Sequence, residues 1–131
     1  MRIWHALLGG LLLAAAGCGT TETPAEVSGT VLMDGQPLPD GEIIFEAADN
    51  AKAPVGGPIA NGKYAVKTTP GAKKVKIQSS RPGTKGDAMM GSASREARLG
   101  PEYHAKSTLT ADLKPGKNDG VDFQVKELPK K

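Results

Sequence analysis

The chain has 131 residues, a length that suits one modest domain, and its composition argues against several classes of protein. It has 17 basic and 14 acidic residues, a formal net charge of +3, and only five aromatic residues. A nucleic-acid site needs clustered basic residues with aromatic side chains that stack on bases, so no nucleic-acid partner is expected. The single cysteine excludes a disulfide within the chain, and 17 glycines and 10 prolines indicate many turns.

The first 18 residues have the layout of an export signal. Arg2 is followed by an apolar run over residues 3–16, which ends in small residues before Cys18. Residues 15–18, Ala-Ala-Gly-Cys, resemble the lipobox of bacterial lipoproteins. That resemblance implies cleavage between Gly17 and Cys18 and a lipid such as palmitate on the Cys18 sulfur. It also implies an exported protein, lipid-anchored to the bacterial cell membrane or the outer membrane.

Two other interpretations of this segment stay open. An uncleaved transmembrane helix would need about 20 residues, more than the run offers, and the run contains His5 and two glycines. An ordinary secretory signal would leave Cys18 as a free thiol, which is a liability in an exported protein. Leucine is commonest three residues before a lipobox cysteine, and this chain has Ala15 there. Lipidation is still favoured, because position, composition and cysteine count agree.

Cleavage would leave 114 residues with a net charge of +2, because Arg2 is removed with the signal. We expect a signal peptide over 1–17, a lipidated cysteine and short tether over 18–25, one domain over 26–126 and a charged tail over 127–131. Seven tether residues reach at most about 25 Å when fully extended. The domain is therefore expected close to the membrane surface.

Apolar and polar residues alternate with a period of two along the domain, as expected of half-buried strands. The alternation predicts strands over 27–33, 42–47, 58–60, 63–67, 74–78, 107–113 and 121–126, with 58–60 a short edge strand. Asp34-Gly35 and Asn61-Gly62 are turn pairs typical of hairpins. Gly29 inside a strand indicates a bulge or a close approach of two backbones. The lysines of 74–78 fall on outward positions, and Pro129 and the terminal lysines would protect the last edge from pairing.

Residues 79–106 interrupt this pattern. They are rich in Gly, Ser, Arg and Lys, and residues 94–99 are predicted to form one short helical turn before Gly100-Pro101 ends it. Loops of such length are usually functional or disordered, so the candidate contact surfaces are an exposed sheet edge or this region. Met89 and Met90 are candidate ligand contacts within it, although two methionines are too few for a metal site.

Six or seven short strands with regular turns predict an all-β fold, a β-sandwich. Its predicted core consists of Val27, Val31, Met33, Leu38, Ile43, Phe45, Ile59, Tyr64, Val66, Val75, Ile77, Leu109, Leu113, Val121, Phe123 and Val125.

A family resemblance rests on four stretches of the domain and on its closing part. The stretches are Val-Ser-Gly-Thr-Val-Leu-Met-Asp-Gly-Gln-Pro-Leu at 27–38, Ile-Ile-Phe at 43–45, Asn-Gly-Lys-Tyr at 61–64, and Pro70-Gly71 before Val-Lys-Ile at 75–77. Together they resemble the carboxypeptidase-regulatory-like domain, and residues 101–123 resemble small bacterial lipoproteins built on it. The resemblance implies a seven-stranded, transthyretin-like or Ig-like sandwich. It implies no peptidase activity, and motifs made of turn and core positions specify a fold better than a function.

Residues suited to catalysis or metal binding are few. His104 is the only histidine after signal removal, and nothing places a serine and an acid around it, so an enzyme is not expected. Zinc needs several His or Cys ligands. Calcium would suit the six aspartates at or near turns, but aspartate in turns is explained by local hydrogen bonding. Those aspartates are Asp34, Asp40, Asp49, Asp112, Asp119 and Asp122. No metal or cofactor is expected.

The favoured hypothesis is a membrane-anchored envelope lipoprotein whose sandwich is a non-catalytic binding or structural module. Its partners would be the membrane, through Cys18, and an envelope protein or a glycan. The alternative is a carbohydrate-binding surface domain, for which Tyr103 is the one plausible exposed aromatic platform. A hydrolase built around His104 ranks last.

Overall fold

The computed structural model describes residues 22–50, 52–83 and 95–129. These residues form β-strands joined by turns and one short 3₁₀ helix, η1 (Pro101–Tyr103), as the sequence predicts for an all-β fold. Among them, no helix is long and apolar enough to cross a membrane. The predicted signal peptide, Cys18 and the Met89-Met90 pair lie outside the described residues.

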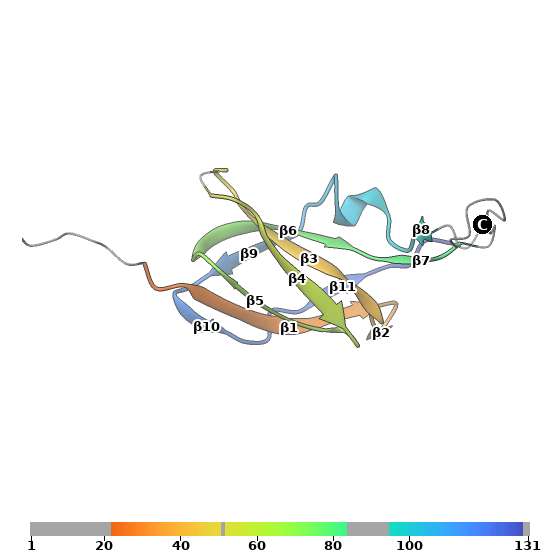
Figure 1. The fold of residues 1–131 in the computed structure, drawn as a ribbon, viewed down its shortest axis with the longest axis horizontal. Coiled ribbons are helices and arrows are strands. Elements are labelled where there is room, and N and C mark those ends of the chain that lie inside the picture. The colour runs from red at the N-terminus through yellow and green to blue at the C-terminus, as the bar shows by residue number, and fades with distance from the viewer. Residues whose placement is uncertain (1–21, 51, 84–94, 130–131) are drawn as a thin grey trace, which may run out of the picture.

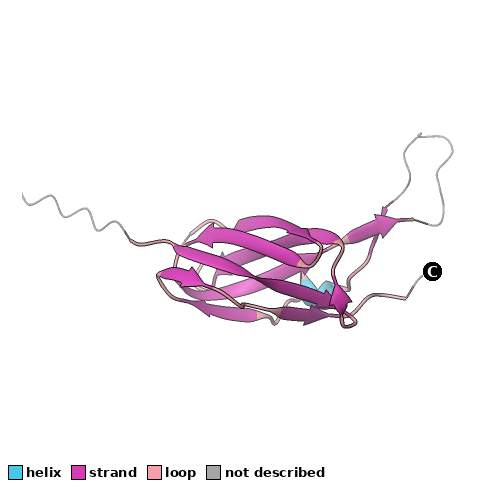
Figure 2. Ribbon diagram, turned by 90° about the horizontal axis from the view of Figure 1, so that it is seen from below, coloured by secondary structure: helices cyan, strands magenta, loops and turns pink. Residues whose placement is uncertain are grey.

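One curled sheet contains most of the strands, and its inner face encloses the core (Figures 1 and 2). Its order is β10-β1-β5-β4-β3-β6-β9, and β2 and β11 also pair with β1. The strands are β1 (Ala25–Met33), β2 (Gln36–Pro37), β3 (Asp40–Ala47), β4 (Val55–Ala60), β5 (Lys63–Thr68), β6 (Gly71–Gln78), β9 (Thr110–Leu113), β10 (Gly116–Asn118) and β11 (Phe123–Val125). A separate two-stranded ribbon consists of β7 (Ser80–Pro82) and β8 (Arg95–Ala97).

Strand β1 lies second in this order and pairs with four strands, β2, β5, β10 and β11. It pairs antiparallel with β5, and parallel first with β10 and then with β11. Between β10 and β11 the chain passes close over Gly29 of β1, where an added Cβ would lie 2.0 Å from the Val121 carbonyl oxygen. Gly29 is therefore a close backbone approach, one of the two interpretations that its place in a strand suggests. The Tyr64 hydroxyl donates to the same carbonyl at 2.5 Å.

Two predicted tight turns are confirmed. Asn61 and Gly62 join β4 to β5 with φ of 51° and 75°, and Asp34 and Gly35 join β1 to β2 with φ of 51° and 81°. Two consecutive residues with positive φ are the signature of a type I′ turn, which suits the twist of a hairpin.

The predicted core is confirmed almost throughout. All its members are buried except Met33, Leu109 and Val121, which are partly buried and pack against it. Ala25 and Leu99 are buried as well and were not predicted. Burying a large apolar side chain is worth roughly 1.5–3 kcal/mol, and chain entropy offsets most of the total.

Three local predictions are wrong. The segment predicted as a helical turn over 94–99 forms strand β8 over its described part, because Arg95–Ala97 pairs with Ser80–Pro82. The predicted edge strand 58–60 is longer, and β4 lies between β3 and β5. It pairs with β5 only at Ala60, so most of its length bonds on one side, which suits a Pro58 without an N–H.

The third wrong prediction is that residues 114–120 form only a turn cluster. They contain strand β10. The parallel pairing of β10 with β1 joins segments about 90 residues apart, and no local sequence pattern predicts it.

Candidate binding groove

A groove of about 850 Å³ lies where β3 and β6 meet the ribbon. We call it the ribbon groove. Its walls come from the start of β3, the end of β6, the β7–β8 ribbon, η1 and the C-terminal segment. Its charged and polar lining includes Asp40, Glu42, Gln78, Arg95, Glu96 and His104, and its apolar lining includes Leu99 and Leu128. A concave surface of this size with a few polar groups is the usual form of a binding site.

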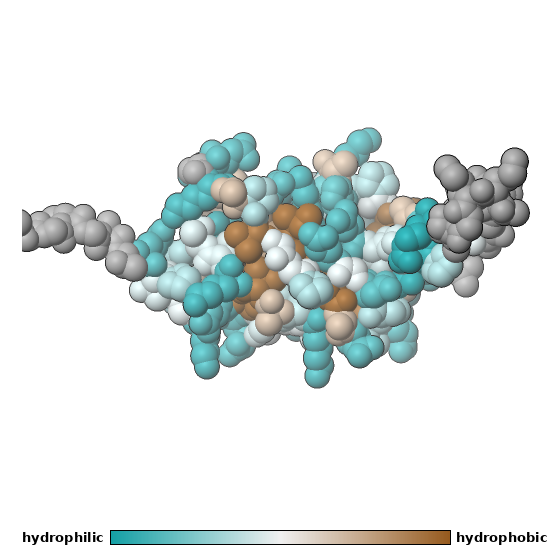
Figure 3. Space-filling view, in the orientation of Figure 1, coloured by the Kyte–Doolittle hydropathy of each residue, from teal (hydrophilic) through white to brown (hydrophobic). Residues whose placement is uncertain are grey.

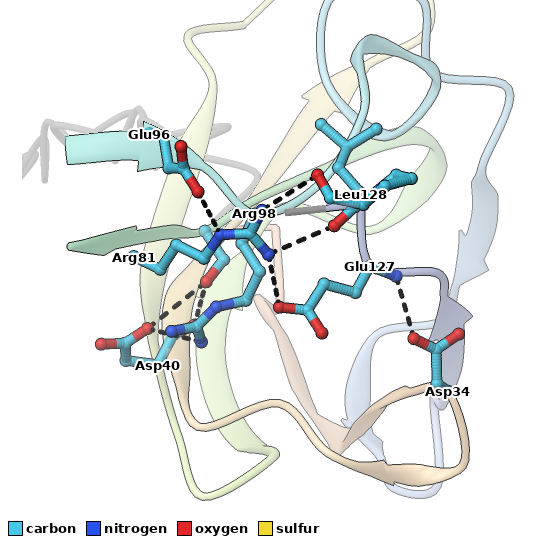
Figure 4. Close-up of polar contacts among 9 residues, drawn as sticks. Asp34, Asp40, Arg81, Glu96, Arg98, Glu127 and Leu128 are labelled. Atoms are coloured by element: carbon cyan, nitrogen blue, oxygen red, sulfur yellow. Dashed lines mark hydrogen bonds and ion pairs between the residues drawn. The ribbon is translucent and has the colours of Figure 1, made fainter. Parts of the chain in front are cut away.

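Arg81 holds the ribbon beside the groove. Its side chain is 8% exposed, and its Nε donates to Glu96 at 2.6 Å while Nη1 donates to Glu127 at 2.7 Å (Figure 4). The guanidinium also donates to the carbonyl oxygens of Leu128 and Pro129, each at 3.2 Å. The hydrogen bond that Arg81 donates to Glu96 raises the pKa of Arg81 most, with a further contribution from Glu127, against the opposing effect of burial. Arg81 therefore stays charged and fastens three separate segments together.

A second arginine fastens the base of the ribbon to the sheet. Arg98 donates to Asp40 Oδ1 at 3.2 Å, and the Arg98 side chain is 12% exposed (Figure 4). Ser79 Oγ donates to the Asp40 carbonyl oxygen at 2.7 Å, and the Arg98 amide donates to the Ser79 carbonyl at 2.9 Å. These bonds fix the angle at which β7 leaves the end of β6, and so they fix one wall of the ribbon groove.

The C-terminal segment closes another wall. The Glu127 amide donates to Asp34 Oδ2 at 3.2 Å, the Leu128 amide donates to the Arg98 carbonyl at 2.8 Å, and Leu99 forms an antiparallel bridge with Glu127. The predicted charged tail is therefore fastened to the domain over Glu127–Pro129. We call these three residues the C-terminal strap.

The predicted candidates near the groove have structural partners. Tyr103 is half-buried, packs against the core, and its hydroxyl accepts a hydrogen bond from the Lys126 amide at 3.1 Å. His104 lines the groove, and its backbone amide donates to the Pro101 carbonyl at 3.1 Å.

The aspartates considered for calcium mostly bond to segments distant in the chain, not within their own turns as the sequence suggests. Asp122 Oδ1 accepts from the Thr30 amide at 2.8 Å, Asp119 accepts from Ser28 Oγ at 2.9 Å, and Asp34 and Asp40 have the partners given above. Over residues 22–50, 52–83 and 95–129, no group of three or more His, Cys, Asp or Glu side chains is placed to hold a metal ion.

A scan of protein-family models, a search of curated proteins and a search of solved structures each returned no match to this chain. The resemblance to carboxypeptidase-regulatory-like lipoproteins therefore stays a prediction.

The Arg81 cluster is the feature that sequence reasoning missed. Arg81, Glu96 and Glu127 come from three places in the chain, and two of them lie in the region predicted to be irregular. The available signal was the presence of opposite charges on both flanks of that region, which does not by itself specify a pairing.

Proposed function

We propose that this chain is a membrane-anchored envelope lipoprotein whose β-sandwich is a non-catalytic binding module. It engages an envelope protein through the ribbon groove. The anchor is the lipid predicted on Cys18, and the expected partners exclude nucleic acid.

The observation that carries the proposal is the placement of the groove relative to the anchor. The described chain enters at one end of the sandwich, and the ribbon lies at the other end (Figure 1). Strand β6 begins beside β9 at the entry end and leads into the groove lining at Gln78. Its eight residues extend about 26 Å. A module tethered at Cys18 would therefore hold the ribbon groove away from the membrane and open to a partner.

The surface supports the same proposal. Hydrophilic side chains cover most of the face seen in Figure 3, with hydrophobic atoms in small patches among them. Recognition on such a surface would depend on shape and polar groups in a concave site more than on a flat apolar patch. Arg81 and the C-terminal strap keep that site in one shape, which lowers the entropy lost on binding.

A crosslinking experiment in cells tests this function. A photoreactive amino acid replaces Gln78 in the groove or, as the control, Asp112 on β9 at the entry end. Both positions are exposed. We expect one envelope protein to crosslink reproducibly from position 78 and not from position 112.

A groove-filling variant sharpens the test. Ala97→Trp places a large ring in the ribbon groove, and Ala65→Trp places the same ring on an exposed position of β5. The crosslink from position 78 should fall at least tenfold with Ala97→Trp and stay within twofold with Ala65→Trp. Equal crosslinking from positions 78 and 112, or a crosslink that Ala97→Trp leaves intact, would refute the groove as the binding surface.

A further inference from the structure

Lys73 breaks the outward pattern of lysines on β6. Its side chain shares the inward face with Val75 and Ile77, and Lys73 is only 4% exposed. Its Nζ donates to Thr69 Oγ1 at 2.7 Å. The neighbouring Lys74 is exposed, and Lys76 pairs with Glu46 at 2.8 Å.

The buried ammonium of Lys73 has no acidic partner among the described residues. The lysines that form ion pairs there are Lys52, Lys67 and Lys76. An ammonium group has three N–H donors, and one neutral hydroxyl accounts for a single donor. A charge removed from water is costly unless it is paired, so this position calls for an anion that the chain itself does not supply.

A small cavity adjoins this ammonium. It has a volume of about 360 Å³ and is lined by Lys73, Thr69, Lys52, Glu22, Asp49 and the backbone near Gly71. Glu22 is already neutralised by Lys52, with Nζ and the carboxylate oxygen 2.7 Å apart. Asp49 has an interaction of its own. Among the described residues that line this cavity, the Lys73 ammonium is thus the cation without an ion pair.

We propose that this cavity is an anion site in which Lys73 binds a phosphate or phosphodiester group. Lysine binds phosphate as a point charge, and the Thr69 hydroxyl that now accepts from Lys73 can rotate to donate to a phosphate oxygen. The carboxylates of Glu22 and Asp49 limit the affinity.

Two sources can supply this chemistry, inorganic phosphate or the headgroup of a phospholipid. Glu22 lies four residues after Cys18, so the cavity wall is within about 14 Å of the predicted anchor along an extended chain. If Cys18 is lipidated, headgroup phosphates lie within reach of the cavity. This lipid source rests on the proposed function, whereas binding of free phosphate does not.

The test begins with free phosphate. The full processed chain, purified in a maltoside detergent that contains no phosphate, is titrated with inorganic phosphate at constant ionic strength. Binding is followed by the amide NMR signals of Thr69–Lys73. We expect saturable shifts centred on Lys73 that chloride does not produce. Lys73→Met should weaken phosphate binding at least tenfold, whereas Lys67→Met, an exposed lysine at the same end of the sandwich, should leave it within twofold.

The stability of Lys73→Met is a second readout. A buried charge without a partner is expected to cost stability, so this variant should melt at the same temperature as the parent chain or higher in phosphate-free buffer. If it fails to fold, Lys73 has a purely structural role and the proposal is overturned. Lys52→Met provides the same binding test on an exposed side chain, with an expected loss of a few-fold.

The lipid source is tested in nanodiscs of phosphatidylglycerol without free phosphate. The same amide shifts should appear for the lipidated chain and disappear with Cys18→Ser. Shifts with free phosphate alone would assign the site to soluble phosphate. An unmodified Cys18 in the mass spectrum would refute the anchor while leaving the phosphate titration valid. No shift with either source would overturn the proposal.

Discussion

Among the described glycines, Gly29 is the one at which an added Cβ would come nearest to backbone atoms. The chain between β10 and β11 passes directly over β1 there, so even a methyl group meets backbone atoms of Val121. Backbone atoms move far less readily than the end of a side chain.

We therefore predict that Gly29→Ala lowers the free energy of unfolding by about 3 kcal/mol or more. Gly35→Ala is the matched control, because a Cβ there meets nothing within 4 Å. Only the positive φ of residue 35 disfavours the alanine. Gly35→Ala should lower the free energy of unfolding by about 1 kcal/mol. Urea denaturation measures both. Equal costs for the two variants would contradict the close approach at Gly29.

Tyr64 gives the domain a pH dependence above neutrality. Burial and, to a lesser extent, the nearby Asp122 carboxylate raise the pKa of Tyr64 well above its usual value near 10. Because the folded state holds the phenolic proton more tightly than the unfolded chain does, Tyr64 contributes fully to stability below pH 10. This contribution is lost as the pH rises above 10, where Tyr64 ionises in the unfolded chain.

We expect Tyr64→Phe to cost about 1 kcal/mol at pH 7, through loss of the hydrogen bond to Val121. The difference in unfolding free energy between parent and variant should shrink between pH 9 and pH 11. Denaturation curves across that range provide the measurement. A difference that stays constant with pH would show that Tyr64 ionises equally in both states.

The C-terminal strap is the element that holds the ribbon groove in shape. It supplies Glu127 and two carbonyl groups to Arg81, and it covers the buried Leu99 through the bridge to Glu127. Without the strap, a buried guanidinium would keep only Glu96 as its acidic partner.

Ending the chain after Lys126 should therefore loosen the ribbon more than the sheet. Hydrogen exchange is expected to speed up in β7 and β8 at least tenfold and to change little in β1 and β5. Glu127→Gln is the milder companion variant and should give a smaller effect in the same strands. Exchange that rises uniformly over the domain would contradict a local role for the strap.

Patterns of period two predicted most of these elements, but not their partners. Alternation and the Asn61-Gly62 pair identify local hairpins such as β4–β5, because a turn residue with positive φ is a local requirement. The parallel pairs that β1 makes with β10 and β11 join distant segments, and nothing local specifies them. Lys73 was missed for a related reason, since lysine is so often solvated that an inward position is unexpected.

On the scale of the whole molecule, the two ends of the sandwich have different roles in the proposed function. The end that the chain enters carries the Lys73 cavity within reach of the predicted anchor. The opposite end carries the ribbon groove, which Arg81 and the strap keep rigid. Strand β6 links the two, from Lys73 near its start to Gln78 at its end.

The anchor decides whether this arrangement has the orientation that we propose, and an intact-mass measurement of the chain extracted from membranes tests it most directly. We predict that the mature chain begins at Cys18 and carries the added mass of acyl chains. Cys18→Ser should abolish both the added mass and the membrane association. A chain that still begins at Met1, or that carries a free thiol at Cys18, would contradict the account.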